Sequence, residues 1–198
     1  DDQVADAEKI RDYGMYVAYS TFSYCKNRYS RKEEWICTHL TWVSHVSGKR
    51  ESRRVVGDYI LREQDLTRPI VHEDATCTTT WRIDQHYPDP RNADKYPGEE
   101  WMSIGVLTPI DFYPLPYRCF YSKDIPNLFM AGRNISVSHI ALGSTRVMRT
   151  CGLIGEVVGM AASICTKKKA NPRDVYTTYF EDLKALMRKG TGRTDVPY

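Results

Sequence analysis

The sequence predicts an α+β fold, with a sheet-forming middle flanked by helices, and three observations support this class. Near the beginning, from Val4 to about Tyr24, apolar residues recur at helical spacing. The middle of the chain holds short runs of threonine, aromatic and β-branched residues, which are typical of strands. Toward the end, the segment 171–190 carries helix start and stop signals. The 198 residues are enough to bury one good core.

The first half of the chain is expected to contribute three extended segments. The aromatic and β-branched residues of 35–46 predict a strand that ends in a Ser-Gly turn. The segment 53–61 is strand-like at its beginning, and the following residues 62–66 (R-E-Q-D-L) indicate a short helical turn. The segment 77–84 (C-T-T-T-W-R-I-D) is expected to be extended.

In the second half, the proline-rich segment 87–98 predicts a long surface loop. Strands are expected at 101–107 and 117–121. The short apolar run 127–131 (N-L-F-M-A) indicates a fully buried strand, because it is continuous and bounded by turn residues.

Two helices are expected at the end of the chain. The first should begin after Gly143 and continue to about Cys165. The second has the better-marked ends: Asn171 as the N-cap, Pro172 in the first turn, and Gly190 after the last turn.

Composition and charge exclude several classes of function. A net charge of +3 is too small to indicate nucleic-acid binding, and no uninterrupted apolar run is long enough to span a bilayer. The six cysteines include no C-x-x-C pair, so we expect no bound metal. We expect the cysteines to be reduced, mostly buried thiols, and such thiols favour a cytoplasmic location. The chain begins at Asp1 without a methionine, and we therefore expect an upstream portion to have been removed.

One segment combines a short apolar run with closely spaced glycines. After the run 127–131, Gly132 lacks side-chain bulk and lets a ligand approach the backbone. Gly143 is then expected to open a helix whose free N–H groups would hold an anion or an electron-rich carbonyl. The same pattern also occurs in α/β packing with no ligand at all. Arg146 and Arg149 would oppose the dipole of that helix, so at least one of them should have a ligand or a carboxylate as partner.

Several motifs in the same order resemble the C-terminal portion of the bacterial FAD-dependent oxidoreductase family, some members of which carry the label xanthan lyase. The resemblance covers most of the chain. The motifs are G-K-R-E-S-R-R-V-V-G-D-Y (48–59), W-R-I-D-Q-H (81–86), L-P-Y-R-C (115–119), N-L-F-M-A-G-R-N-I-S (127–136) and H-I-A-L-G-S-T-R-V-M-R-T-C (139–151).

The resemblance implies two functional regions. Residues 1–126 would form a substrate-side (cap) region with a mixed or antiparallel sheet. Residues 127–198 would be the C-terminal part of a FAD-binding Rossmann-like domain, contributing its last strand and helix. The family's G-x-G-x-x-G turn, which holds the pyrophosphate, does not occur in this sequence. The resemblance therefore implies a missing N-terminal FAD-binding segment as a partner.

The implied cofactor is FAD. In the family, the helix that Gly143 would open points its N-terminus at the pyrimidine edge of the flavin, where it favours hydride uptake. The positions that match the family's cofactor-binding residues are Gly132, Arg133, Asn134, Gly143, Ser144, Thr145, Arg146, Val147 and Met148.

The candidates for substrate chemistry are two histidines and a Tyr-Arg pair. His139 would lie close to the flavin ring and accept a proton from the substrate as hydride leaves. His86 is a second candidate, because Asp84 is two residues earlier on the same strand face and would orient the imidazole. Tyr117 and Arg118 are candidates for the substrate side. For each histidine the alternative is a structural role, and for Tyr117 it is a place in the core.

The sequence thus indicates a segment of a soluble enzyme that transfers hydride from a small organic substrate to FAD. A homo-oligomer is one possible state of this enzyme. Two other classes stay open. One is a non-catalytic fragment or binding domain without flavin. The other is a carbohydrate lyase of the xanthan type, for which Tyr117, Arg118 and His139 would supply the proton transfer.

Overall fold

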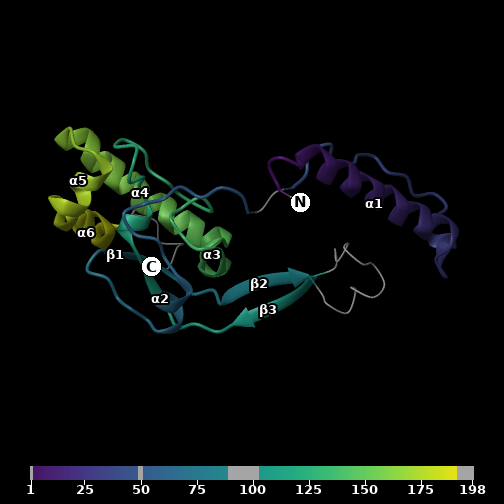
Figure 1. The fold of residues 1–198 in the computed structure, drawn as a ribbon, viewed down its shortest axis with the longest axis horizontal. Helices are drawn as coiled ribbons and strands as arrows, with labels where there is room; N and C mark the ends of the chain where they lie inside the picture. Colours follow the sequence, from purple (N-terminus) through teal and green to yellow (C-terminus); the bar gives the residue numbers. More distant parts are fainter. Residues whose placement is uncertain (1, 49–50, 89–102, 191–198) are drawn as a thin grey trace. The chain divides into compact units, whose positions relative to one another are not determined.

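The computed structural model describes residues 2–48, 51–88 and 103–190. Contacts within the chain divide it into two compact units, residues 1–52 and residues 53–198. The boundary expected at residue 126, between the substrate-side (cap) region and the FAD-binding region, is a different division of the chain and stays a prediction. Helices and small antiparallel sheets make up the fold, so the α+β class is confirmed (Figure 1).

Unit 1 is built around the helix α1 (Ala7–Asn27), as the helical spacing of its apolar residues predicted. The strand expected at 35–46 is wrong: the chain there forms the 3₁₀ helix η1 (Lys32–Trp35) and then an irregular segment. The ammonium of Lys26 donates to the carbonyls of Ile36 and Thr38, at 3.1 and 2.7 Å. These bonds hold the segment against α1, and the described residues of unit 1 contain no strand with which it could pair.

The described residues of unit 2 form two small antiparallel sheets. In one, β1 (Ala75–Thr79) pairs with β4 (Tyr113–Pro116). In the other, β2 (Ile83–Pro88) pairs with β3 (Ser103–Thr108). The segment expected to be extended, 77–84, is confirmed at 77–79 in β1 and at 83–84 in β2. The strand expected at 101–107 is confirmed from residue 103 onward, in β3. Of the expected loop, residues 87 and 88 belong to β2 and the rest lies outside the described residues.

An irregular layer replaces three of the expected strands. Residues 53–61, 117–121 and 127–131 form no regular strand, and only the isolated bridges Leu61–Val137 and Tyr121–Phe129 remain. Residues 117–119 are instead the 3₁₀ helix η3. These predictions were wrong because apolar composition alone does not distinguish a strand from a buried irregular segment.

The segment 55–61 nevertheless lies between two other segments and bonds to both. On one side, the Leu61 N–H donates to the Ser136 carbonyl at 3.1 Å. On the other, the Tyr59 N–H donates to the Arg118 carbonyl at 3.4 Å. Gly57 is required at the centre, because a Cβ atom there would lie 2.5 Å from the Arg118 carbonyl oxygen.

Helices cover this framework. The short α2 (Glu63–Thr67) confirms the helical turn expected after residue 61. The expected long helix after Gly143 is instead two helices, α3 (His139–Thr145) and α4 (Met148–Lys168). The last expected helix is also divided, into α5 (Pro172–Thr177) and α6 (Phe180–Lys189). Its predicted start is confirmed, because the Asn171 N–H donates to the Asp174 carboxylate at 2.8 Å.

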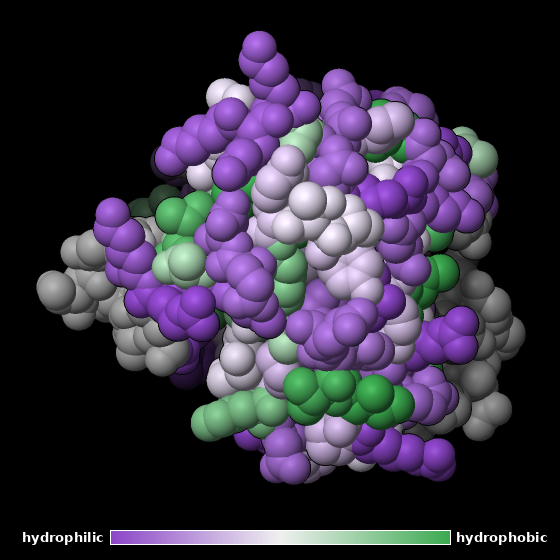
Figure 2. All heavy atoms as spheres, turned by 90° about the vertical axis from the view of Figure 1, so that its left-hand side faces the viewer, coloured by the Kyte–Doolittle hydropathy of each residue, from purple (hydrophilic) through white to green (hydrophobic). Residues whose placement is uncertain are grey.

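The core of unit 2 lies where α4, α5 and α6 meet β1, β4 and η3. Three tyrosines, Tyr113, Tyr117 and Tyr121, are among its largest fully buried side chains. Figure 2 views the end of the unit that carries α5 and α6, where hydrophilic residues cover most of the surface. By length and composition alone α4 is apolar enough to cross a membrane, a property that core helices of soluble proteins share.

Candidate functional site at the junction of α3 and α4

The glycine expected to open the cofactor helix lies inside α3. The N-cap of α3 is Ser138, whose hydroxyl accepts a hydrogen bond from the Ala141 N–H at 3.4 Å. Gly143 is buried in the middle of this helix, so the expectation that its N–H groups are free at a helix start is wrong. The free helix start lies farther along the chain, at Met148.

Gly143 has a packing function instead. A Cβ atom at this position would lie 2.6 Å from the Gln85 amide nitrogen and 2.7 Å from the Asp84 carbonyl oxygen. Gln85 donates from the same amide to the Ile140 carbonyl at 3.0 Å. The absence of a side chain therefore lets α3 pack directly on the backbone of β2.

The start of α4 is open. Val147 is its N-cap in an extended conformation and has no side-chain acceptor for the first N–H groups of the helix. Met148, the first helical residue, is 92% exposed. The positive end of a 21-residue helix thus faces outward with no capping side chain, which is an arrangement suited to an electron-rich ligand.

The loop 132–134 lies beside this helix start. Gly132 has φ of +98°, a backbone conformation that a side chain would strain, and open space surrounds the place where its Cβ would be. The positive charge of Arg133 acts on the Cys151 thiol, which is in the first turn of α4. Asn134 is exposed and accepts a backbone hydrogen bond from Val55. The structure therefore brings the predicted loop and the helix start together.

Charged side chains connect the junction of α3 and α4 to the strand β2. The Arg146 guanidinium lies 3.4 Å from the Asp84 carboxylate and also donates to the Asp84 carbonyl at 3.1 Å. The other carboxylate oxygen of Asp84 lies 3.2 Å from His86 Nε2. The expected pairing of Asp84 with His86 is confirmed, and so is the expected carboxylate partner for one of the two arginines.

Buried hydroxyls fill the space under the junction. The Ser144 hydroxyl donates to the Trp81 carbonyl at 2.7 Å and lies 3.1 Å from the Thr79 hydroxyl. Thr79 also lies 3.3 Å from the Thr150 hydroxyl. The Thr145 hydroxyl is buried and has no hydrogen-bond partner among the described residues. Ser144 is therefore a structural residue, whereas Thr145 leaves an unpaired polar group three residues before Met148.

The remaining predicted catalytic residues lie in different surroundings. His139 is exposed in the first turn of α3. Tyr117 is fully buried and donates its hydroxyl to the Pro172 carbonyl at 2.9 Å, which favours the alternative of a core residue. Arg118 donates two hydrogen bonds to the fully buried Asp74, each of 3.0 Å. This pairing raises the pKa of Arg118 and engages the Nε–H and one NH2 group of its guanidinium.

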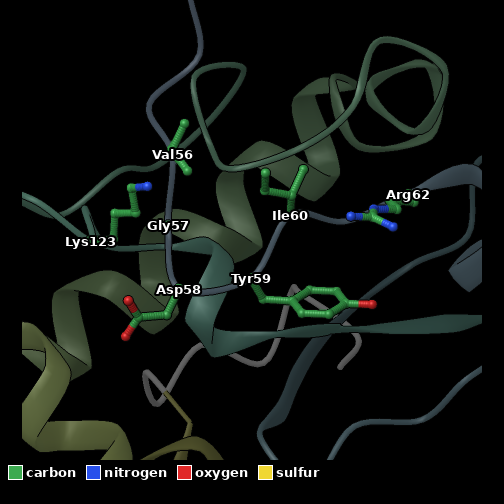
Figure 3. Close-up of a pocket in the computed structure, with 7 residues that line it drawn as sticks. All are labelled: Val56, Gly57, Asp58, Tyr59, Ile60, Arg62 and Lys123. Carbon is green, nitrogen blue, oxygen red and sulfur yellow. The ribbon is translucent and has the colours of Figure 1, made fainter.

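Sequence reasoning missed a groove along Val56–Ile60. It has a volume of ≈ 420 Å³, and Figure 3 shows the Asp58 carboxylate and Lys123 at one end and Arg62 at the other. Asp58 accepts hydrogen bonds from Arg173 at 2.7 and 2.6 Å and from the Tyr121 hydroxyl at 2.8 Å. Hydrogen bonds from Arg173 hold the pKa of Asp58 below its ordinary value. These bonds give Asp58 a structural role at the edge of the groove.

The cysteines are free thiols in the described part of the chain. Burial raises the pKa of Cys119 and of Cys151, so neither is a thiolate at neutral pH. Cys119 is buried, Cys37 is exposed and the other four are half-buried, so the expectation of mostly buried thiols is confirmed only in part. No cluster of three metal-binding side chains occurs within the described residues.

Comparison with known protein families gives a match over most of the chain. A family model described as FAD dependent oxidoreductase matches residues 2–187. No curated protein and no solved structure matches the chain significantly. The description of the matching family is that of an oxidoreductase, so it does not carry the xanthan lyase label.

Proposed function

The chain belongs to the FAD-dependent oxidoreductase family, and we propose that it forms the flavin-ring side of a FAD site and part of the adjoining substrate pocket. When bound, the flavin supplies the chemistry of hydride acceptance from a small organic substrate. The residues of this chain would bind and orient the ring and accept the accompanying proton.

The open start of α4 is the observation that carries this proposal. Val147 provides no capping side chain, and Met148 is exposed. The N–H groups and the positive dipole end of α4 would stabilise negative charge at the pyrimidine edge of the ring. Gly132, with its positive φ, would let the neighbouring loop approach the cofactor closely. The residues present thus fit the ring end of the cofactor, at Met148 in place of the expected Gly143.

His86 is the proposed proton acceptor. Asp84 contacts one of its ring nitrogens at 3.2 Å, and Arg146 holds Asp84 from the other side. A histidine oriented in this way can accept a hydroxyl proton from a substrate. His139, which is exposed on α3, is the second candidate for the same step.

The adenosine half of the cofactor would be held elsewhere. We propose that a G-x-G-x-x-G segment outside these 198 residues binds the pyrophosphate and packs on the glycine face of α4. Gly152, Gly155 and Gly159 form that face, and open space surrounds each of them among the described residues. Glycines three and four apart on one helix allow another backbone to approach closely. The free thiols favour a reducing, cytoplasmic location for the assembled enzyme.

Flavin uptake tests the proposal. The purified chain would be titrated with FAD alone and together with a G-x-G-x-x-G segment from the same family. We expect visible flavin absorbance to remain with the protein after gel filtration only when both pieces are present. If the mixture binds no flavin while the segment is folded, the proposed site does not exist. Release of unsaturated sugar ends from a polyuronide would instead support a lyase.

A further inference from the structure

A cavity of ≈ 720 Å³ lies between β1 and the helices α4 and α6, apart from the α3–α4 junction. This volume is within the range of roughly 300–1,000 Å³ that is usual for small-molecule sites. The residues that line it are Ala75, Thr76, Cys77, Thr78, Thr80, Phe112, Arg149, Leu153, Glu156, Val157, Met160, Lys184, Met187 and Arg188.

One wall of the cavity is apolar. Leu153, Val157 and Met160 follow each other at helical spacing on one face of α4, and Met187 faces them from α6. The thioether side chains adapt their shape to a ligand. The Cys77 thiol adds to this wall, because burial raises its pKa to about 12 and keeps it uncharged at neutral pH. The wall therefore suits a hydrocarbon or aromatic body.

Positively charged side chains outnumber negatively charged ones around the cavity. Three cations line it, but Glu156 is the one carboxylate among its lining residues. The Lys184 ammonium already binds the Glu181 carboxylate at 2.8 Å. Arg149 is exposed in the first turn of α4, where the helix dipole disfavours a cation, and within the described residues no ion pair neutralises it. Of the two arginines near this helix start, Arg146 pairs with the Asp84 carboxylate, whereas Arg149 forms no such pair among the described residues.

We propose that this cavity binds a small organic monocarboxylate, with its carboxylate on Arg149 and its apolar body along Leu153, Val157 and Met160. The planar guanidinium matches a carboxylate through two parallel hydrogen bonds. Arg149 and Met160 are eleven residues apart, about 16 Å along a helix, which leaves room for an elongated body. Glu156, two turns after Arg149, would repel a second carboxylate and so restrict the site to monoanions.

Binding of a charge series to the 198-residue chain tests this proposal without any flavin. The probes are 4-phenylbutyrate, its uncharged amide and 4-phenylbutylamine, which share one apolar body. Isothermal titration calorimetry should detect 4-phenylbutyrate binding at least about tenfold more tightly than the amide, as a hydrogen-bonded ion pair would require. We expect no measurable binding of the amine. Equal binding of the three probes, or binding of none of them, would overturn the proposal.

Two variants locate the site. Arg149→Gln should weaken 4-phenylbutyrate binding at least about tenfold and leave amide binding unchanged. The matched control Arg68→Gln changes another exposed arginine, which is not among the residues that line the cavity, and should bind as the unmodified chain does. Leu153→Glu places a carboxylate on the apolar wall and should also abolish binding of the anion. Retention of full affinity by Arg149→Gln, or an equal loss in Arg68→Gln, would contradict the assignment.

Discussion

The guanidinium of Arg146 lies 3.4 Å from the carboxylate of Asp84, and this ion pair joins the residue before the N-cap of α4 to the strand that carries His86. The side chains are 18% and 20% exposed, so solvent only partly screens their attraction. Because Asp84 also contacts His86, one carboxylate orients groups from the cofactor side and from the substrate side of the proposed site.

A double-mutant cycle measures that coupling. Arg146→Gln and Asp84→Asn should each destabilise the chain, and the double variant should be more stable than the sum of the two losses predicts. The interaction free energy should be about 1 kcal/mol, as is usual for a partly buried pair. Urea unfolding of the four proteins provides the free energies. Strict additivity would show that the two side chains do not interact in solution.

Gly143→Ala should destabilise the chain by about 1–3 kcal/mol, because the added Cβ overlaps the backbone of β2. Gly155→Ala is the matched control on α4, where open space surrounds the new atom. That variant should be more stable than the unmodified chain by up to about 1 kcal/mol, because alanine is the better helix former. Urea unfolding compares the two. Similar effects from both substitutions would disprove the close packing of α3 on β2.

Arg118→Gln should cost about 3 kcal/mol of stability, because it leaves the fully buried carboxylate of Asp74 without its cation. Thermal and urea unfolding measure the loss. If Arg118 served the substrate instead, the variant would keep its stability and lose only ligand binding. That outcome would return Arg118 to the set of candidate substrate residues.

The stability that Asp58 contributes to the folded chain should fall as the pH is lowered. Its pKa in the folded chain is below the ordinary value of 3.8, chiefly because Arg173 donates hydrogen bonds to it. Such a carboxylate contributes fully above its unfolded pKa, and the contribution is lost as pH falls through the folded pKa. The stability advantage of the unmodified chain over Asp58→Asn should therefore be constant above about pH 5 and shrink below about pH 4.

Urea unfolding at several pH values measures this difference. Asp111→Asn, which changes an exposed carboxylate, is the control and should differ little from the unmodified chain at every pH. An advantage for Asp58 that grows on acidification would contradict the sign of the shift.

The sequence predicted correctly the elements that are stabilised by residues close to one another in the sequence. The start at Asn171 has its own N-cap and a nearby aspartate, and β2 has a two-residue alternation that places Asp84 and His86 on one face. The strands expected at 53–61 and 127–131 were wrong, because their backbone partners come from distant segments and do not form a regular ladder. Sequence spacing does not reveal such partners.

The break between α3 and α4 was missed for a related reason. Gly143 is typical of a helix start, but here its missing side chain serves contact with Asp84 and Gln85. Val147 interrupts the helix in an extended conformation although its residue type gives no such signal. The loop 132–134 lies beside a helix start in the structure, but that helix begins at Met148, five positions after the expected Gly143.

The affinity for FAD of a Val147→Asp variant, measured together with the G-x-G-x-x-G segment, tests the central claim most directly. A carboxylate at the N-cap would bond to the first N–H groups of α4 and add negative charge where the ring is expected, while stabilising the helix by about 1 kcal/mol. Thr166→Asp adds the same charge near the other end of α4 and is the control. We predict that Val147→Asp weakens FAD binding at least about tenfold and that Thr166→Asp does not. Equal FAD affinity in the two variants would show that the start of α4 does not hold the flavin.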